Sequence, residues 1–216
     1  MAEDGRTLAE RFEEGPIPPR EALRIGVGAA RDLARAHARG TFHGALEPGR
    51  VFLRDDGGVE VLERGPVHPS GLPDARAHAY RAPEQWAGAA EDQRADVFAL
   101  GVMLFRMLSG KLPFPGDDGG KALRSSDPAP ALDVPPYAMA DLVARMLEKD
   151  PSGRPRDCGR VLAVLAHVQR QVEQAPEETP GSATAPRRPM SRAALLAVAG
   201  TVLAALVAAF ALRGSR

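Results

Sequence analysis

Apolar residues return at helical spacing along much of the first 173 residues. Between positions 19 and 39 they recur every three or four residues, which is typical of one buried helix face, and Gly40 ends the pattern. The residues that carry it are Leu23, Val27, Ala30, Leu33, Ala34 and His37. Residues 137–149 and 157–172 show the same one-sided periodicity, so we expect two more amphipathic helices there.

Residues 97–109 differ because nearly every position is apolar. Asp96 is a suitable N-cap for this helix, and Gly110 follows its end. A helix that is apolar all round has no face for water, so this segment predicts the centre of the core.

Two short runs of β-forming residues, 51–54 and 59–62, are joined by Asp55-Asp56-Gly57-Gly58. An acidic and glycine-rich connection between such runs predicts a β-hairpin. Residues 65–82 contain several Pro and Gly and predict a loop. The body is therefore expected to be mainly α-helical with one small hairpin.

The C-terminal end of the chain has a different pattern. Residues 193–212 form a run of 20 residues without a charge, and arginines stand on both sides of it. A helix of this length spans about 30 Å, the thickness of a bilayer's hydrocarbon core. We expect a single transmembrane helix with a cytoplasmic body at the cell membrane; the alternative is a buried or dimerising soluble helix.

The rest of the chain divides around that run. Residues 174–192 are rich in Pro, Ser and Thr and predict a flexible juxtamembrane linker, and residues 213–216 form a short tail. Residues 1–173 form the body.

Composition narrows the classes of partner. The 28 basic and 28 acidic residues cancel, and no basic patch with interleaved aromatics is found, so we expect no nucleic-acid partner. The single Cys158 cannot form an internal disulfide, which fits a reducing cytosol.

Six motifs lie along the body in a fixed order. They are Phe42-His43-Gly44-Ala45-Leu46-Glu47-Pro48-Gly49-Arg50, Val59-Glu60-Val61-Leu62-Glu63-Arg64-Gly65, Tyr80-Arg81-Ala82-Pro83-Glu84-Gln85, Ala95-Asp96-Val97-Phe98-Ala99-Leu100-Gly101, Leu108-Ser109-Gly110-Lys111-Leu112-Pro113-Phe114 and Leu147-Glu148-Lys149-Asp150-Pro151-Ser152-Gly153-Arg154-Pro155. Together they resemble the C-terminal lobe of bacterial Ser/Thr protein kinases of the Hanks type. The first resembles the catalytic loop H-R-D-L-K-P-x-N, and the third resembles the end of the activation segment.

The resemblance implies a structural role for four residues. By carry-over, Glu84 pairs with Arg154, a contact between a carboxylate and a guanidinium. Asp96 holds the backbone of the loop at 43–50 as well as capping its helix. His43 is expected to pack as a core histidine.

At the chemical positions this sequence departs from the family. The base Asp is Ala45, the phosphate-binding Lys is Glu47, the metal-binding Asn is Arg50, and the metal-binding Asp is Glu63. The family's glycine-rich loop and V-A-I-K lysine are not found, so the N-terminal lobe is expected to be absent. Although the family uses ATP and magnesium, we expect neither cofactor nor metal here.

These expectations lead to a degenerate kinase-like C-terminal lobe, or pseudokinase, that is not an enzyme. It would act as a membrane-anchored, catalytically inactive scaffold in signalling, with an active kinase or that kinase's substrate as its protein partner. One alternative is a Ser/Thr protein kinase with displaced catalytic groups such as Glu47 or Glu63. A second alternative is a decayed kinase fragment without a selected role.

Overall fold

The computed structural model describes residues 4–63, 77–114, 121–125 and 127–174. They fall within the first of two compact units, which cover residues 1–175 and 176–216. Apart from Gln174, the expected linker, transmembrane run and tail lie outside the described residues, as does most of the expected loop at 65–82. Among the described residues, no helix is both long enough and apolar enough to cross a membrane.

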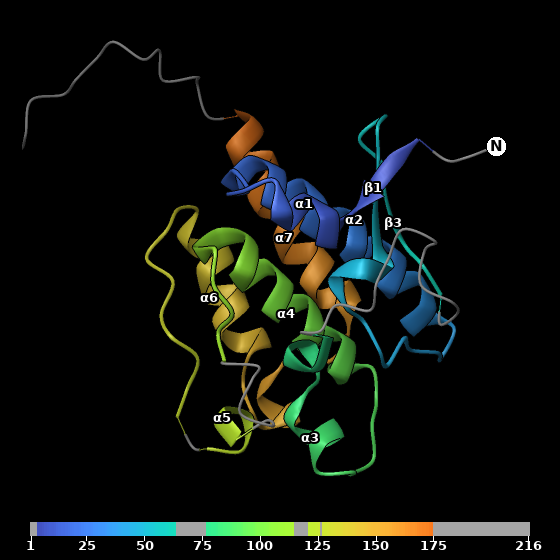
Figure 1. The fold of residues 1–216 in the computed structure, drawn as a ribbon, viewed down its shortest axis with the longest axis vertical. Helices are drawn as coiled ribbons and strands as arrows, with labels where there is room; N and C mark the ends of the chain where they lie inside the picture. The colour runs from blue at the N-terminus through green and yellow to red at the C-terminus, as the bar shows by residue number, and fades with distance from the viewer. Residues whose placement is uncertain (1–3, 64–76, 115–120, 126, 175–216) are drawn as a thin grey trace, which may run out of the picture. The chain divides into compact units, whose positions relative to one another are not determined.

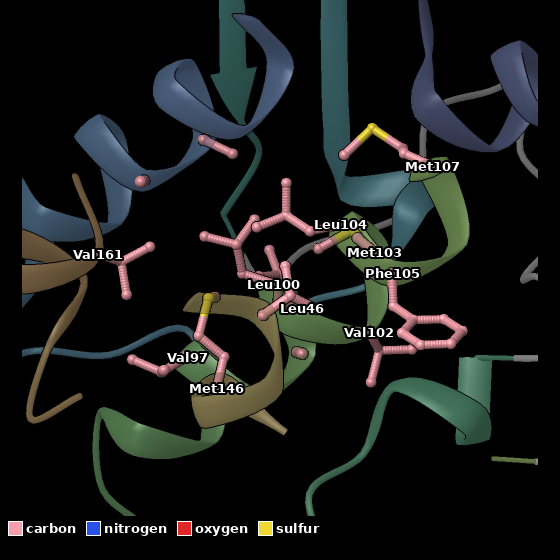
Figure 2. Close-up of a cluster of buried hydrophobic side chains, with 14 of the residues drawn as sticks. Leu46, Val97, Leu100, Val102, Met103, Leu104, Phe105, Met107, Met146 and Val161 are labelled. Carbon is pink, nitrogen blue, oxygen red and sulfur yellow. The ribbon is translucent and has the colours of Figure 1, made fainter. Parts of the chain in front are cut away.

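Helix α4 (Arg94–Ser109) forms the centre of the core, as its all-round apolar pattern predicts. It packs against α2 (Pro19–Ala38), α6 (Tyr137–Met146) and α7 (Cys158–Gln174), which surround it in Figure 1. The close-up in Figure 2 shows α4 side chains meeting side chains from the neighbouring segments. Gly110 ends α4 in the left-handed conformation, with a φ of 70°.

The start of α4 corrects one prediction. The helix begins at Arg94, its N-cap residue is Gln93, and Asp96 lies inside the first turn. Asp96 therefore does not cap α4, and its carboxylate is available for other contacts.

Two glycines allow the helices to approach closely. A Cβ at Gly26 of α2 would lie 2.7 Å from Leu104 of α4 and 3.4 Å from Leu165 of α7. A Cβ at Gly101 of α4 would lie 2.9 Å from the Cβ of Met146 in α6. Neither position has room for a side chain without movement of its neighbours.

The β structure is larger than the expected hairpin. Strands β2 (Val51–Arg54) and β3 (Val59–Val61) pair as predicted, but β1 (Gly5–Thr7) adds an antiparallel third strand beside β2. Strand β1 is three residues long and has no alternating apolar pattern, so periodicity does not reveal it. Thr7 then caps α1 (Leu8–Glu13) in a capping box with Glu10.

The remaining described elements are short. They are the helices α3 (Pro83–Trp86) and α5 (Lys121–Arg124) and the 3₁₀ turns Pro48–Arg50, Ala77–Tyr80 and Pro151–Gly153. The turns Pro48–Arg50 and Pro151–Gly153, together with α3, place residues of the candidate site.

Candidate functional site

The carboxylate of Asp96 organises the loop that follows α2. Its Oδ2 accepts the backbone N–H of His43 and its Oδ1 accepts that of Gly44, both at 2.7 Å. Gly44 has a φ of 66°, a left-handed conformation that glycine adopts without strain. Asp96 is 1% exposed, so these bonds satisfy a carboxylate that water hardly reaches.

His37 completes this network, and sequence patterns did not single it out as a site residue. Its Nδ1 accepts the backbone N–H of Cys158 at 3.1 Å, so the proton lies on Nε2, which donates to Asp96 at 2.9 Å. His37 occupies an ordinary core position in the apolar stripe of α2, and its two partners are distant in sequence. No local signal could therefore have identified its role.

His43 is half-buried and not the core histidine that we expected; among the described residues, His37 is the buried one. The Nε2 of His43 lies 2.9 Å from the carbonyl oxygen of Leu62, and its Nδ1 accepts the Ala45 N–H at 3.2 Å. The ring therefore joins the loop to the end of β3.

The four positions that depart from the family lie on that loop and at the end of β3. Ala45 is exposed and offers only a methyl group. The Arg50 Nη1 donates to the carbonyl oxygen of Glu63 at 3.1 Å, and its Nε lies 3.8 Å from the Glu47 carboxylate. The guanidinium of Arg50 thus links the loop to the segment at Glu63. In the family, these two segments carry the metal-binding residues.

These donors do not fit a magnesium site of the family type. Magnesium requires oxygen ligands, whereas Arg50 presents a cation and Glu63 a single exposed carboxylate. In the described part of the chain, no group of three His, Cys, Asp or Glu side chains could hold a metal ion. We therefore assign no reaction step to a metal at these residues.

A surface hollow of about 680 Å³ lies beside this loop. It is bounded by the C-terminal half of α2, the loop and the end of β3, and Phe42 at its edge is 42% exposed. The lining residues that matter below are Leu33, Ala36, Arg39, Phe42, Val61 and Glu63. Its lining is mixed, with five charged residues beside the apolar ones, and two of the charged residues, Arg39 and Glu63, have no ion pair among the described residues.

Glu84 and Arg154 form the contact that the resemblance implies. The Nη1 and Nη2 atoms of Arg154 donate to the two carboxylate oxygens of Glu84 at 2.7 and 2.8 Å. Arg154 also donates to the carbonyl oxygens of Glu148, Lys149 and Arg94. Its side chain is fully buried, so this pair fixes α3 against the segment that leads into α7.

Two further residues approach the loop from α3 and the chain after it. Gln85 donates through Nε2 both to the carbonyl oxygen of Gly44 at 2.8 Å and to the carboxylate of Glu91 at 2.9 Å. The side chain of Gln85 therefore links the Glu91 carboxylate to the backbone of Gly44, the residue before Ala45. Only the motif position of Gln85 could have pointed to this contact, and nothing in the sequence pointed to Glu91.

The comparisons with known proteins agree with the resemblance. A protein-family model described as protein kinase domain matches residues 5–167. A probable serine/threonine-protein kinase of Clostridium perfringens is 28% identical over 182 residues, which are 77% of this chain and 26% of the relative. The serine/threonine-protein kinase pkn2 of Myxococcus xanthus is 32% identical over 185 residues, which are 76% of this chain and 22% of the relative.

A third relative is the DNA damage-responsive serine/threonine-protein kinase RqkA of Deinococcus radiodurans. It is 32% identical over 174 residues, which are 73% of this chain and 25% of the relative. The chain thus spans about a quarter of the length of these three relatives.

These findings correct one expectation. The prediction that the chain is not an enzyme is wrong, because the protein kinase domain match and the relatives named as Ser/Thr kinases point to a kinase enzyme. The kinase resemblance itself is confirmed, while the pseudokinase role and the transmembrane helix stay predictions.

Proposed function

Because this chain belongs to the protein kinase family, we propose that it acts in signalling as a regulatory lobe that binds a protein partner in the hollow beside Phe42. The partner is a Ser/Thr kinase or a substrate of that kinase. The observation that carries the proposal is the hollow itself, formed beside a loop whose backbone is held on several sides.

The loop supports this proposal because hydrogen bonds hold its backbone at several points. Asp96 holds two consecutive backbone N–H groups, and His43 ties the same segment to Leu62. A preorganised surface loses less conformational entropy when a partner binds than a mobile one does.

The chemistry of the hollow indicates the kind of segment that fits. Ala36 and Val61 are half-buried and provide aliphatic surface, and Phe42 is an exposed aromatic that a partner could cover. The polar and charged residues of the same lining can set the orientation of a bound segment. We propose that the partner inserts an apolar side chain between Arg39 and Glu63.

The test compares two exposed aromatics by capture from detergent-solubilised membranes. The full chain, the Phe42→Ala variant and the Tyr137→Ala variant serve as bait, since Tyr137 is 62% exposed on α6, away from the hollow. Loss of an aromatic contact of about 1.4 kcal/mol lowers affinity about tenfold. Recovery of a kinase or kinase substrate should fall in Phe42→Ala alone, and equal recovery by all three would exclude the hollow as the binding site.

A second candidate function is phosphoryl transfer with a displaced base, and the contact between Gln85 and Glu91 favours it. A carboxylate near the loop could accept the proton of a substrate hydroxyl, which the methyl group of Ala45 cannot do. Incorporation of radiolabelled phosphate into a generic substrate should then be lost in Glu91→Gln and kept in Glu60→Gln. Absence of any midpoint shift with ATP and magnesium in a thermal melt would remove this candidate.

We also propose that residues 193–212 hold the body at the cytoplasmic face of the membrane. The support is the uncharged run of 20 residues with arginines at both ends. The full chain should stay in the membrane pellet after carbonate extraction, whereas residues 1–175 should not. Release of the full chain by carbonate would exclude a spanning helix.

A further inference from the structure

Arg50 connects two segments of the candidate site through both its backbone and its side chain. Its backbone carbonyl oxygen accepts the Leu62 N–H at 2.8 Å, and its Nη1 donates to the carbonyl oxygen of Glu63 at 3.1 Å. In the other direction, its backbone N–H donates to the carbonyl oxygen of Glu47 at 2.9 Å within the turn Pro48–Arg50. Arg50 therefore ties the loop after α2 to the two residues that follow β3.

The charge of Arg50 is largely shielded from water. The side chains of Arg50 and Glu47 are each 12% exposed, and the Arg50 Nε lies 3.8 Å from the Glu47 carboxylate. This Nε is buried and has no hydrogen-bond partner among the described residues. The contact with Glu47 is therefore an attraction between opposite charges without an aligned hydrogen bond, and low exposure to water strengthens such an attraction.

The two groups that the Arg50 side chain contacts are of the kind that a hard divalent cation binds. Such cations take carboxylate and carbonyl oxygens as ligands, and Arg50 contacts the carboxylate of Glu47 and the carbonyl oxygen of Glu63. A guanidinium keeps its proton throughout the pH range of folded proteins. The loop thus has a permanent positive charge between oxygen atoms of its two segments.

We infer that the Arg50 guanidinium is a built-in cation that takes the place of a divalent metal ion at this loop. It holds the loop to the segment after β3, and it keeps divalent cations away because a second positive charge at the same oxygens is repelled. This explains why the donors at positions 47, 50 and 63 do not fit magnesium. The inference is separate from partner binding, and since Glu63 also lines the hollow, its test measures metal binding and stability.

The test measures Mn²⁺ binding to the full chain in a nonionic detergent. Mn²⁺ prefers the same oxygen ligands as Mg²⁺, and the electron paramagnetic resonance signal of the free ion falls when it binds to protein. Arg50→Asn replaces the repelling charge by an amide oxygen that can coordinate an ion. Its affinity for Mn²⁺ should therefore exceed that of the wild type at least about tenfold. The gain should be lost when Arg50→Asn is combined with Glu47→Gln, which removes the carboxylate beside position 50.

Thermal melts of the same proteins measure how firmly Arg50 holds the loop. In the presence of a chelator, Arg50→Asn should melt about 3–12 °C below the wild type, because it loses a charge-assisted hydrogen bond and an ion pair. Mn²⁺ should restore part of this difference, whereas the wild type should melt at the same temperature with chelator and with Mn²⁺.

Two further variants separate charge from shape. Arg50→Lys keeps the positive charge without the planar guanidinium, so it should exclude Mn²⁺ as the wild type does. Arg81→Asn removes an exposed arginine elsewhere in the chain and should change neither Mn²⁺ affinity nor the melting temperature.

Several results would overturn the inference. Wild-type Mn²⁺ binding that disappears in Glu47→Gln would show that Arg50 does not exclude the ion. An Arg50→Asn protein that melts with the wild type in chelator, or that folds without a gain in Mn²⁺ affinity, would show that the charge has no such role. If Arg50→Asn does not fold, Arg50→Lys decides: exclusion of Mn²⁺ by this variant supports the inference, and Mn²⁺ binding by it rejects the inference.

Discussion

The guanidinium of Arg154 is fully buried and bonds to several partners. It donates to both carboxylate oxygens of Glu84 and to three backbone carbonyl oxygens, and it lies 4.8 Å from the centre of the Phe98 ring. A buried cation with this many partners costs little only while its counter-charge is present. The pair therefore fixes the packing of α3 rather than a reactive group.

The Glu84→Ala variant should be strongly destabilised. Removing the carboxylate leaves the buried Arg154 charge without its anion, which typically costs about 3–5 kcal/mol. Urea unfolding of residues 1–175 followed by circular dichroism measures the change. Glu60→Ala is the control, because its pair with Arg54 is about half-exposed and should contribute less than about 1 kcal/mol; equal effects in the two variants would contradict the expected role of Arg154.

A second residue pair sets the response to acid. Hydrogen bonds from Arg11 lower the pKa of Glu21 below its ordinary value of 4.5, which means that the folded state favours the ionised carboxylate. A lowered pKa adds stability above pH 4.5 and loses it as the pH falls through the folded-state pKa. Glu21→Gln should therefore be less stable than the wild type by about 1–2 kcal/mol at neutral pH.

The sign of this effect is checked by measuring both proteins at several pH values. The difference in urea midpoint between wild type and Glu21→Gln should be constant at neutral pH and should shrink below pH 4.5. A difference that grows in acid would show that another group, and not Glu21, controls acid stability.

The predictability of these residues from sequence differs for physical reasons. Glu84 and Arg154 stand in motifs, so their contact could be expected before the structure was known. His37 is a single polar residue in an apolar stripe, and its partners at Asp96 and Cys158 lie 59 and 121 positions away. Periodicity describes which face is buried and cannot reveal which distant polar groups meet there.

At the level of helices and strands, close packing depends on missing side chains. Gly101 lets α4 approach α6, since any Cβ there would meet Met146 and Leu147 at 2.9 and 3.3 Å. The nearest of these atoms is the Cβ of Met146, which is fixed to the backbone of α6 and cannot move away without it.

The Gly101→Ala variant should therefore lose stability despite alanine's better helix propensity. Overpacking by one methyl group in a tight core costs about 1–3 kcal/mol, more than the gain in propensity of about 1 kcal/mol. Urea unfolding measures the balance, and Ala163→Ser, at an exposed position of α7, is the control. A stabilised Gly101→Ala protein would mean that α4 and α6 can separate at no cost.

Periodicity predicted the helices better than the strands and turns. The segment expected at 19–39 is α2, and the expected central helix is α4 with three more residues at its start. Strand β1 was missed because its pairing with β2, not its composition, makes it a strand. The hold of Asp96 on the loop 52 residues earlier was expected from the motif resemblance and is confirmed, whereas its assignment as a helix cap was wrong because α4 begins two residues before it.

Across the whole body, Cys158 reports whether the core is intact. Burial raises the pKa of its thiol well above the ordinary value of 9.0, and the side chain is fully inaccessible. The native thiol should therefore not react with Ellman's reagent until the core opens. Reaction rates should follow the global unfolding equilibrium, and a fast reaction in the absence of urea would contradict this.

The same thiol predicts a loss of stability in alkali. Because the folded-state pKa is raised, the unfolded state releases its proton first, and stability falls as the pH rises above about 9. Cys158→Ala should remove this part of the alkaline dependence. Parallel curves for wild type and variant between pH 8 and about 10 would show that Cys158 does not contribute.

The bond between the Cys158 backbone and His37 makes the order of synthesis relevant to the loop at 43–44. During translation, α2 and the loop emerge first, but the imidazole that steadies Asp96 receives its second partner only 121 residues later. A nascent chain that stops before position 158 lacks the hydrogen bond from the Cys158 N–H to His37. A chain that reaches position 174 contains all of α7 and can form that bond. Ribosome-bound intermediates should accordingly remain open to proteases at this loop until α7 has been made.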